Sequence, residues 1–586
     1  MFLMLAAYLV PAAWGQAPLS PTTSVPAESR FPPAPDLYYG AWVLTPPLVT
    51  IVLALVLRQV VPALVVGVLI AACMLVPCLP PEAAFGGGVI GGVRLALERY
   101  LLGALARLDP DTGRVDYGHL KILVFTLLIG GMVGVIAANG GTKTLVDRVA
   151  RWASTRQRGQ LVGWLAGMLV FFDDYASAMI VGPALRPVTD RLRISRAKLA
   201  YIVDSTAAPI SSIALIGTWV GAEVGYIDAG LQGLSNRPAF LADVSAYSVF
   251  LASIPYRFYA ILALVMVFWI GLLGRDFGPM RKAEEAAPPA ADDTPPPGPT
   301  SQPQRGHAWY AVVPVLVLVV ATLGLLVATG WPAAPPGESE LPGSGPRWFR
   351  LAQQIVSDAD PYNSILYGAV AALLVAAGIS LATRALSLGR TVDSATEAMS
   401  RLLPTLIVLV LAWSLSDAIG DLKLGEVART LLKQYGLAAT WLPLLVFISA
   451  CIVSFATGTS WGTMGILCPA TITVAAGVLA DLPPAEARTL FYAAVGSVLA
   501  GAVFGDHCSP ISDTTVLSAL ASQCSLEQHV WTQMPYALTV AAVSALSGEV
   551  LCRQCQLAPW VGLLTGAALL FLITLLLGRP AARVRE

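Results

Sequence analysis

Charged side chains are scarce in this chain. Lys, Arg, Asp and Glu make up 12% of its 586 residues, while 56% of the residues are hydrophobic. A soluble globular protein usually has about a quarter of its residues charged, so the composition excludes an ordinary soluble domain and indicates a polytopic helical membrane protein. The 36 basic residues balance the 36 acidic residues. Because no stretch concentrates the basic side chains, the sequence also argues against a nucleic-acid partner.

Cysteine and histidine are few, with eight and four residues respectively. Only Cys552 and Cys555 have a spacing that suggests a metal site, and one such pair is weak evidence. Most other cysteines lie in or beside apolar runs, where cysteine acts as a small packing residue. The sequence therefore predicts no cofactor, and no metal apart from a transported ion.

Nine segments are long and apolar enough to cross a bilayer, whose hydrocarbon core of about 30 Å needs about 20 helical residues. They are residues 41–57, 60–78, 119–139, 247–273, 309–330, 362–383, 402–420, 533–550 and 557–578. We therefore predict a multi-pass protein of a bacterial cytoplasmic membrane, with the lipid bilayer as its surroundings.

The remaining segments suggest a division into two transporter halves, residues 41–274 and 309–550. Residues 275–308 contain a Pro-rich, acidic stretch typical of a disordered linker, which we place in the cytoplasm. Residues 1–15 end in a small-x-small pattern and are predicted to be a signal peptide; no Lys or Arg precedes the apolar run, so a short uncleaved anchor is the alternative. Residues 16–40 form a Pro/Ser/Thr-rich segment expected outside the cell, and residues 551–586 form a last transmembrane helix and a basic tail.

Two segments with polar centres are predicted to be re-entrant helical hairpins. Leu161 to Leu185 carries Asp173 and Asp174 at its middle and has several Arg and Lys residues on both flanks. Basic loops stay cytoplasmic, so this segment enters and leaves on the inside. Each arm of 11 or 12 residues extends about 17 Å. Residues 441–479, with a polar tip at Ala456 to Thr463, repeat the pattern but have an exit loop poor in basic residues, so this hairpin is expected to open outside.

A proline-centred motif follows each hairpin. The first runs from Asp204 to Ser212 around Pro209, and the second from Asp506 to Asp513 around Pro510. Proline removes a backbone donor from a helix, and lipid supplies no replacement, so both prolines are predicted to break a transmembrane helix. Broken helices repeated in two halves indicate a binding site at the membrane midplane. The predicted fold is thus an all-α polytopic membrane protein with an inverted repeat, each half holding a re-entrant hairpin and a proline-broken transmembrane helix.

Carboxylates at membrane depth indicate the chemistry of this site. Each charge placed there costs about 2.5–3.5 kcal/mol, and the broken helices contain no obvious Lys or Arg to compensate it. A desolvated carboxylate holds a proton more tightly, so protons and oxygen-seeking cations would compete for it. The predicted sodium-binding set is Asp173, Asp174, Asp204, Ser205, Thr206, Ser211, Ser212, Thr457, Gly458, Thr459, Ser460, Thr463, Asp506, His507, Ser509, Ser512, Asp513 and Thr514.

Several of these residues have an ordinary structural interpretation as well. A single hydroxyl in a membrane helix usually bonds back to the preceding turn, and His507 either titrates or packs beside the break. Asp506, Ser509 and Asp513 are expected on one helix face. His119 and His529, at span ends, are expected to be solvated. Trp219 and Trp461 either line the substrate path or pack at a hairpin tip.

The motifs together resemble the NhaC-type sodium/proton antiporter family, a group of ion transporters with inverted repeats and two re-entrant hairpins. The matching stretches are Pro46 to Arg58, Phe125 to Gly141, Phe171 to Ser177, Asp204 to Ser212, Ala456 to Thr463 and Gly505 to Thr515, within a similarity that covers residues 41–550. The resemblance implies sodium/proton exchange, an elevator-like movement of the domain that carries the hairpins, and a homodimer. The N-terminal extension, the Pro-rich linker and the spans at 309–330 and 557–578 depart from the family pattern.

The expected function is therefore secondary active exchange of sodium for protons across the cytoplasmic membrane. A sodium-coupled carrier of an organic acid or amino acid is the alternative, because the family includes such carriers. The lack of a fixed cation near the tips favours simple ions, although helix N-termini also hold anions. An intramembrane metal-dependent enzyme that uses Asp173, Asp174 and His507 is a remote alternative. It would be expected to show regular aspartate pairs or His-x-x-x-His spacing, so no enzymatic activity is predicted.

Overall fold

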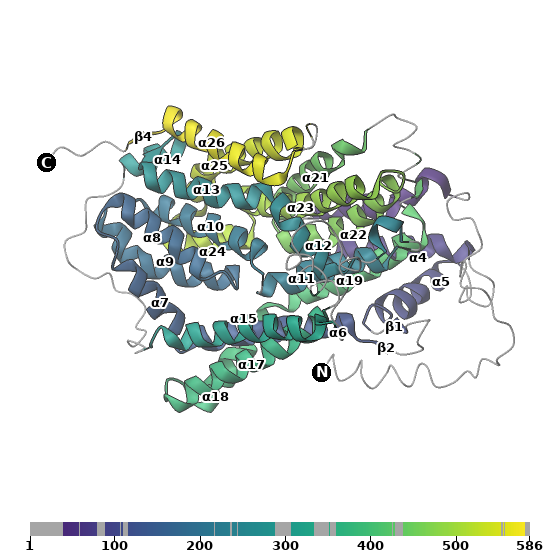
Figure 1. Cartoon of the computed structure of the whole chain (residues 1–586), viewed down its shortest axis with the longest axis horizontal. Helices are drawn as coiled ribbons and strands as arrows, with labels where there is room; N and C mark the ends of the chain where they lie inside the picture. Colours follow the sequence, from purple (N-terminus) through teal and green to yellow (C-terminus); the bar gives the residue numbers. More distant parts are fainter. Residues whose placement is uncertain are drawn as a thin grey trace.

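The computed structural model is a bundle of α-helices with two very short β ladders (Figure 1). It describes residues 39–57, 59–78, 88–105, 107–108, 115–215, 217–234, 237–242, 244–286, 306–332, 351, 355, 359–424, 426–427, 430, 438–552, 555 and 557–580. The predicted signal peptide, nearly all of the segment at 16–40 and residues 287–305 of the predicted linker lie outside these residues.

The first half is helical apart from three short strands, of which β1 and β2 pair antiparallel. In chain order its elements are η1 (Gly40–Leu44), α3 (Thr45–Leu57), α4 (Val60–Leu75), η2 (Val76–Cys78), α5 (Gly88–Leu95), η3 (Ala96–Leu101), β1 (Arg107–Leu108), β2 (Val115–Asp116), α6 (Gly118–Ala138), α7 (Gly141–Ala150), α8 (Arg156–Leu169), α9 (Asp174–Arg191), α10 (Arg196–Ile213), α11 (Thr218–Gln232), η4 (Ala239–Leu241), α12 (Ala246–Ser253), η5 (Ile254–Tyr256), α13 (Phe258–Leu273), β3 (Arg275–Asp276) and α14 (Gly278–Glu285).

The second half is again helical, and its last strand, β4, pairs antiparallel with β3 of the first half. Its elements are α15 (Trp309–Gly330), α17 (Pro361–Ala382), α18 (Leu388–Arg401), α19 (Leu403–Asp421), η6 (Ala439–Trp441), α21 (Leu442–Thr457), α22 (Ser460–Val478), α23 (Pro484–Cys508), α24 (Asp513–Ser522), α25 (Leu526–Ser544), η7 (Ala545–Cys552), α26 (Pro559–Leu577) and β4 (Arg579–Pro580).

The described residues include ten helices that are long and apolar enough to cross a membrane, or up to twelve spans if each of two bent pairs is one span. Each of the nine predicted spans falls on one of these helices, on the bent pair of α12 and α13, or on the shorter apolar helix α3. The bend between α12 and α13 is 46°. The protein is therefore a multi-pass, all-α membrane protein, as the composition predicts.

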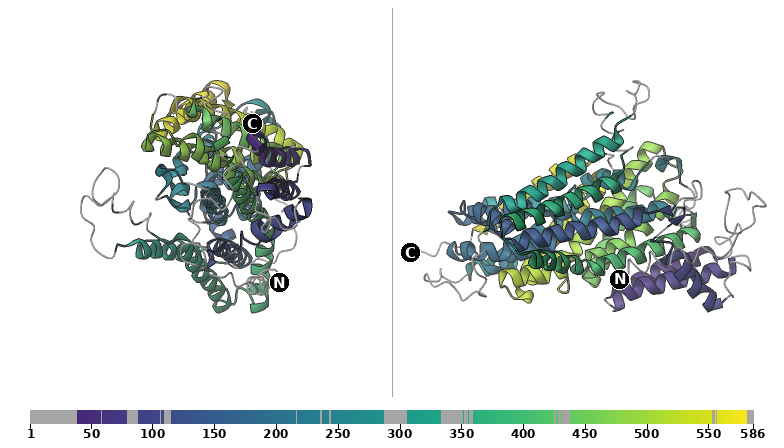
Figure 2. Two further views of the ribbon diagram at one scale, coloured as in Figure 1. Left: turned by 90° about the vertical axis from the view of Figure 1, so that its right-hand side faces the viewer. Right: turned by 90° about the horizontal axis from the view of Figure 1, so that it is seen from below.

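The two halves pack through matching contacts, as an inverted repeat requires. Helix α6 packs against α17, and its counterpart α19 packs against α4. Likewise α11, after the first break, packs against α22 of the second hairpin, while α24, after the second break, packs against α9 of the first hairpin. Each half therefore completes the other, and the second helix of each broken pair lies against the opposite hairpin. Figure 2 shows these helices running through the same bundle from two further directions.

The first hairpin consists of α8 and α9, with the turn at residues 170–173. Its arms have 14 and 18 residues, which corresponds to about 21 and 27 Å at 1.5 Å per residue. They are longer than the predicted 11 or 12 residues because α8 starts within the basic flank and α9 continues through Pro183 and Pro187.

The second hairpin consists of α21 and α22, and its non-helical tip is only Gly458 and Thr459. The predicted polar tip at 456–463 is therefore mostly helical. Gly458 is left-handed, with a φ of 67°, and a Cβ there would lie 2.8 Å from the Ile511 carbonyl oxygen. Glycine is thus required both by the backbone conformation and by the close approach of the second helix break.

The position of the first helix break differs from the prediction. Helix α10 continues through Pro209 and ends at Ile213, so the break comes after Ile213 and before α11, which begins at Thr218; α10 and α11 meet at 51°. Proline removes only one backbone hydrogen bond, and a helix tolerates it when tertiary contacts hold the next turn. The prediction that Pro209 itself marks the break is therefore wrong.

The second break does contain its proline. Helix α23 ends at Cys508, the chain is extended at Ser509, and α24 begins at Asp513, so Pro510 lies in the non-helical segment. This geometry also means that Asp506, Ser509 and Asp513 do not share one helix face, which corrects that prediction.

The open end of the first hairpin lies beside the ends of the first half and of the chain. Arg156, at the start of α8, pairs with Glu284 of α14, and Ser195 N donates to the same carboxylate at 2.7 Å. The open end of the second hairpin lies elsewhere, where Arg488 Nε donates to the Phe240 carbonyl at 2.8 Å. The sequence analysis places the open ends of the two hairpins on opposite sides of the membrane, and in the structure they lie beside different segments. Which end faces the cytoplasm stays a prediction.

Cysteine accessibility tests the sidedness of the hairpins. Single cysteines at Ser154 and Arg191, which flank the first hairpin and are exposed, should be protected from an impermeant thiol reagent applied outside intact cells and should react in inverted vesicles. A cysteine at the exposed Ala485, beside the open end of the second hairpin, should show the opposite pattern. Reaction of Ser154→Cys and Arg191→Cys from opposite sides would contradict the re-entrant arrangement.

Candidate ion-binding site

The tip of the first hairpin is hydrogen-bonded to the first helix break. The Phe172 carbonyl accepts from Thr218 N at 3.0 Å and from Thr218 Oγ1 at 3.3 Å. Ser211 Oγ donates to the Phe171 carbonyl at 3.2 Å. The hairpin tip and the break therefore satisfy each other's backbone groups, which lipid cannot do.

The second hairpin contacts the last turns of α23, just before the second break, through side chains. Ser454 Oγ donates to the Ala502 carbonyl at 2.6 Å. The Ser460 hydroxyl lies 3.3 Å from the same carbonyl and also contacts Asp506 Oδ2. Ser460 is the first residue of α22, so this contact joins the second hairpin to the end of α23.

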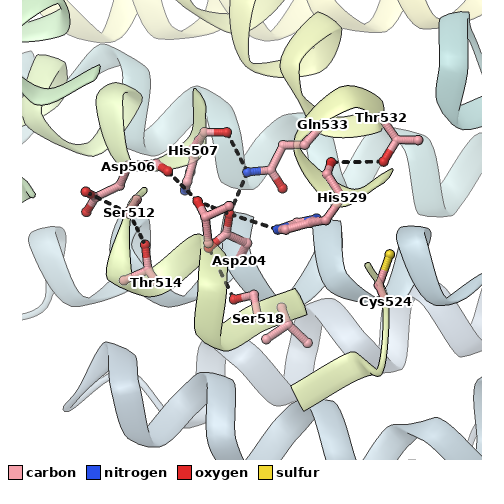
Figure 3. Close-up of polar contacts among 12 residues, drawn as sticks. Asp204, Asp506, His507, Ser512, Thr514, Ser518, Cys524, His529, Thr532 and Gln533 are labelled. Atoms are coloured by element: carbon pink, nitrogen blue, oxygen red, sulfur yellow. Dashed lines mark hydrogen bonds and ion pairs between the residues drawn. The ribbon is translucent and has the colours of Figure 1, made fainter. Parts of the chain in front are cut away.

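Oxygen atoms gather around the Asp506 carboxylate (Figure 3). Ser512 Oγ donates to Asp506 Oδ1 at 3.2 Å, and Thr514 Oγ1 lies 3.1 Å from Ser512 Oγ. Asp506 is 3% exposed, and Ser460, Ser512 and Thr514 are buried as well. One carboxylate and three hydroxyls therefore lie around the second break, from α22, α23, the segment between α23 and α24, and the start of α24.

Asp173 and Asp174 have different environments although they are adjacent. Asp173 caps α9: its Oδ1 accepts from Ala176 N at 2.7 Å, and its Oδ2 accepts from Thr218 Oγ1 at 3.0 Å. Asp174 is 1% exposed, and neither of its carboxylate oxygens has a hydrogen-bond partner among the described residues. Its charge interacts with those of Asp173 and Asp506. The Trp219 indole and the Tyr175 amide also act on this carboxylate as donors, although neither forms a hydrogen bond of normal geometry with it. A buried carboxylate with so little hydrogen bonding is costly to ionise.

The Asp204 carboxylate, in contrast, is surrounded by donors from α24 and α25 (Figure 3). Gln533 Nε2 donates to Oδ2 at 2.5 Å, Ser518 Oγ donates to Oδ1 at 3.2 Å, and Thr515 Oγ1 lies 3.4 Å from Oδ2. His529 Nε2 lies 3.4 Å from Oδ2. The expectation that His119 and His529 are solvated is wrong. His119 is 8% exposed and stacks on Trp413, and His529 is 0% exposed because α25 packs against α10 and α23.

Several predicted hydroxyls bond to their own helices. Thr206 Oγ1 donates to the Ile202 carbonyl at 2.7 Å, as Thr457 does to Val453 and Thr463 to Thr459. These bonds to the preceding turn are the ordinary structural interpretation. Thr459 Oγ1 caps α22 by accepting from Gly462 N at 3.3 Å.

The other predicted residues lie around the cluster in different ways. Ser205 and Ser509 are buried, while Asp513 is exposed at the start of α24. The Tyr175 hydroxyl donates to Asp513 Oδ2 at 3.3 Å, and Tyr175 also interacts electrostatically with Asp173, Asp174 and Asp506. His507 Nδ1 lies 2.9 Å from the Tyr259 hydroxyl.

The sequence reasoning missed two buried ion pairs near the site. Arg257, at the bend between α12 and α13, pairs with Glu223 at 2.6 Å, and both side chains are 0% exposed. Ser212 Oγ donates to the same glutamate at 3.1 Å. Lys198 pairs with Asp276. A charged residue inside an apolar stretch indicates such a pair. Glu223 and Arg257 both lie in such stretches, so the sequence could have revealed this pair.

Trp219 and Trp461 pack on each other, with ring centroids 5.0 Å apart and an interplanar angle of 54°. They join α11 to α22 across the two halves, so the packing interpretation of these residues accounts for the geometry. Within the described part of the chain, no group of three or more His, Cys, Asp or Glu side chains is arranged to hold a metal ion.

Comparisons with known proteins identify relatives of this chain. An uncharacterized protein of Haemophilus influenzae is 30% identical over 515 residues, which cover 87% of this chain and 91% of that protein. The malate-2H(+)/Na(+)-lactate antiporter of Bacillus subtilis is 34% identical over 142 residues, 24% of this chain and 28% of that protein. Among solved structures, the Alcanivorax borkumensis YdaH transporter aligns with a TM-score of 0.49 and 15% identity, over 78% of this chain and 96% of that chain.

A family model gives the assignment. The model of the Na+/H+ antiporter family matches residues 215–548, which is more than half of the chain and includes the second hairpin, both Asp506 and Asp513, and the second helix break. The chain is a secondary transporter and belongs to the Na+/H+ antiporter family.

Proposed function

We propose that this transporter exchanges sodium for protons at the carboxylates of Asp506 and Asp174. The observation that carries the proposal is the buried Asp506 carboxylate, which contacts the hydroxyls of Ser460 and Ser512 where the second hairpin meets the second helix break. The Thr514 hydroxyl lies next to that of Ser512. Hard monovalent and divalent cations prefer oxygen ligands of this kind. These oxygens would hold sodium once the hydroxyl groups turn their lone pairs toward the ion.

Competition between sodium and protons follows from the burial of the same carboxylates. A carboxylate removed from water holds a proton more tightly, and a bound cation neutralises the same charge. Asp174, whose oxygens form no hydrogen bond among the described residues, needs one of the two in either state. The buried carboxylate is electrically neutral only when it holds either a sodium ion or a proton. Binding of one therefore displaces the other, and this alternation is the minimal mechanism of exchange.

Asp173 and Asp204, the other carboxylates of the predicted set that are buried, serve mainly to position the site. Asp173 caps α9 and binds Thr218 at the first break. Asp204 accepts from neutral donors on α24 and α25. Because these carboxylates hold elements together, their replacement should affect folding as well as transport.

A carrier of organic acids is the second candidate, favoured by the similarity to the malate-2H(+)/Na(+)-lactate antiporter over 142 residues. Such a substrate would need a cation or free donors to bind its carboxylate. The buried cations Arg257 and Lys198 are each paired with an acidic side chain of the protein. Simple ions therefore fit the described residues better than an organic anion does.

Replacement of the two carboxylates tests the proposal. Asp506→Asn keeps the size of the side chain but removes its charge and exchangeable proton, so sodium uptake driven by a pH gradient in proteoliposomes should fall at least a hundredfold. Asp174→Asn should cause a loss of the same order and little change in thermal stability, because its oxygens make no hydrogen bond with the described residues. Radioactive sodium uptake and a pH-sensitive dye would measure both directions of exchange.

Asp228→Asn is the matched control, since Asp228 is a buried carboxylate of α11 that accepts from Gln232 at 2.7 Å outside this cluster. It should retain exchange within about threefold. Near-normal uptake by Asp506→Asn would reject the proposed role of Asp506. If sodium uptake required malate or lactate, the protein would be a carrier of organic acids and not a sodium/proton exchanger.

Two adjacent hydroxyls at the second tip separate ion binding from helix capping. Ser460→Ala removes a hydroxyl that contacts Asp506, so the apparent KM for sodium should rise about tenfold with little change in maximal rate. Thr459→Ala removes the cap of α22 and should instead lower stability by about 0.5–2 kcal/mol. Ser449→Ala, on the exposed side of α21 where Oγ bonds back to Leu445, is the control. Equal sodium affinity in Ser460→Ala and wild type would exclude Ser460 as a ligand.

A further inference from the structure

We propose that the guanidinium of Arg257 is a resident cation at the first helix break, where it fills an oxygen site of the same chemical kind as the sodium site proposed at the second break. Arg257 lies between η5 and α13, at the bend between α12 and α13, and its side chain is 0% exposed. The inference rests on the proposed exchange and deepens it, because it states which break takes a transported ion and which one does not.

The guanidinium donates to five oxygen atoms from α10, α11 and α12. Nη1 lies 2.6 Å from Glu223 Oε2 and 3.1 Å from Ser212 Oγ, and it also bonds to the Ser212 carbonyl. Nη2 lies 3.1 Å from Ser253 Oγ and 3.5 Å from the Phe250 carbonyl. Carboxylate, hydroxyl and carbonyl oxygens are the ligands that hard cations prefer. The side chain of Arg257 therefore occupies a place that has the ligand set of a cation site.

The site lies at the end of a helix, where a positive charge is favoured. The last carbonyl groups of a helix have no partner within it and carry a partial negative charge. Ser212 is in the last turn of α10, which ends at Ile213, and Glu223 is in the second turn of α11. The guanidinium thus compensates both the end of α10 and a buried carboxylate on the other side of the break.

The second break has a similar set of oxygen atoms but, among the described residues, no basic side chain paired with it. The Asp506 carboxylate contacts the hydroxyls of Ser460 and Ser512. None of the ion pairs formed by the described residues includes Asp506. The His507 carbonyl, at the end of α23, accepts from the neutral Gln533 amide at 2.8 Å. The first break therefore has a positive charge of the protein, and the second is left to bind one from solution.

The two oxygen sets have different origins. Asp506 lies in the last turn of α23, before the second break, whereas Glu223 lies in α11, after the first break. The two sites are therefore alike in their ligand chemistry and in their place at a break, but they are not copies of each other related by the inverted repeat.

The resident cation also positions the tip of the first hairpin. Arg257 joins α10, α11 and α12 by hydrogen bonds. Thr218, the first residue of α11, in turn binds the Phe172 carbonyl and the Asp173 carboxylate at the hairpin tip. Because the guanidinium is covalently tethered, it cannot leave the site during transport. The first break is therefore held by a permanent charge, whereas the ion at the second break exchanges.

Removal of the guanidinium would leave the other oxygen atoms in place. The Glu223 carboxylate would then be buried without a counter-charge, which is strongly unfavourable. Ser212 Oγ donates to Glu223 Oε1 at 3.1 Å, so the hydroxyl would stay beside the carboxylate and could turn its lone pairs toward an ion. A small cation from solution that enters the vacated space would restore the charge balance, so Arg257→Ala should gain a sodium site.

The test is the number of sodium ions bound per chain by the purified full-length protein in detergent, measured with radioactive sodium at high pH. Arg257→Ala should bind one more sodium ion per chain than wild type does, which a purely structural role of the arginine would not produce. A variant with both Arg257→Ala and Glu223→Gln is the matched control, because it lacks the carboxylate, and it should bind the wild-type number. An Arg257→Ala protein with the wild-type number of ions would overturn the proposal.

A measurement on the wild-type protein covers the case in which Arg257→Ala does not fold. Thallium(I) is a monovalent cation that scatters X-rays strongly, and a structure of wild type with this ion should show it beside Asp506 and not in contact with Glu223. A thallium ion bound by Glu223 and Ser212 in wild type would overturn the proposal. Absence of any ion at Asp506 would instead reject the proposed exchange, so the two failures are distinguishable.

Discussion

Backbone groups at a broken helix have no partner in lipid, and this constraint organises the whole structure. The break after Ile213 is satisfied by the first hairpin tip, through the Phe172 carbonyl and Thr218. The break after Cys508 is covered by the second tip, where the Gly458 backbone leaves no room for a side chain beside Ile511. Because the second helix of each broken pair also packs against the opposite hairpin, neither half completes its own centre.

The same interlocking places the carboxylates and divides them into two kinds. Asp173 and Asp204 have their oxygens occupied by donors that hold tips, breaks and α25 together. Asp506 accepts from the Ser460 and Ser512 hydroxyls, which can turn toward an ion, and the Asp174 oxygens form no hydrogen bond among the described residues. Carboxylates of the first kind give the site its shape. Those of the second kind are the ones at which we propose that a proton or a sodium ion binds.

Much of this arrangement could be predicted from the sequence, because apolar length and basic flanks indicate spans and hairpins directly. The prolines were less informative: Pro510 lies in its break, whereas α10 continues through Pro209, since tertiary contacts and not the proline decide where a helix ends. Asp204 was expected in the site from its motif. Its partners His529 and Gln533 lie more than 300 residues away, and only the packing of α25 against α10 brings them together.

The proposed exchange depends on competition between sodium and protons for the Asp506 carboxylate at the second break. The most direct measurement is a pair of high-resolution structures of the protein, one at high pH in saturating sodium and one at low pH without sodium. We expect an ion at high pH, coordinated by Asp506 and at least one of the hydroxyls of Ser460, Ser512 and Thr514, and no ion at low pH. An ion bound away from Asp506, or the same occupancy at both pH values, would contradict it.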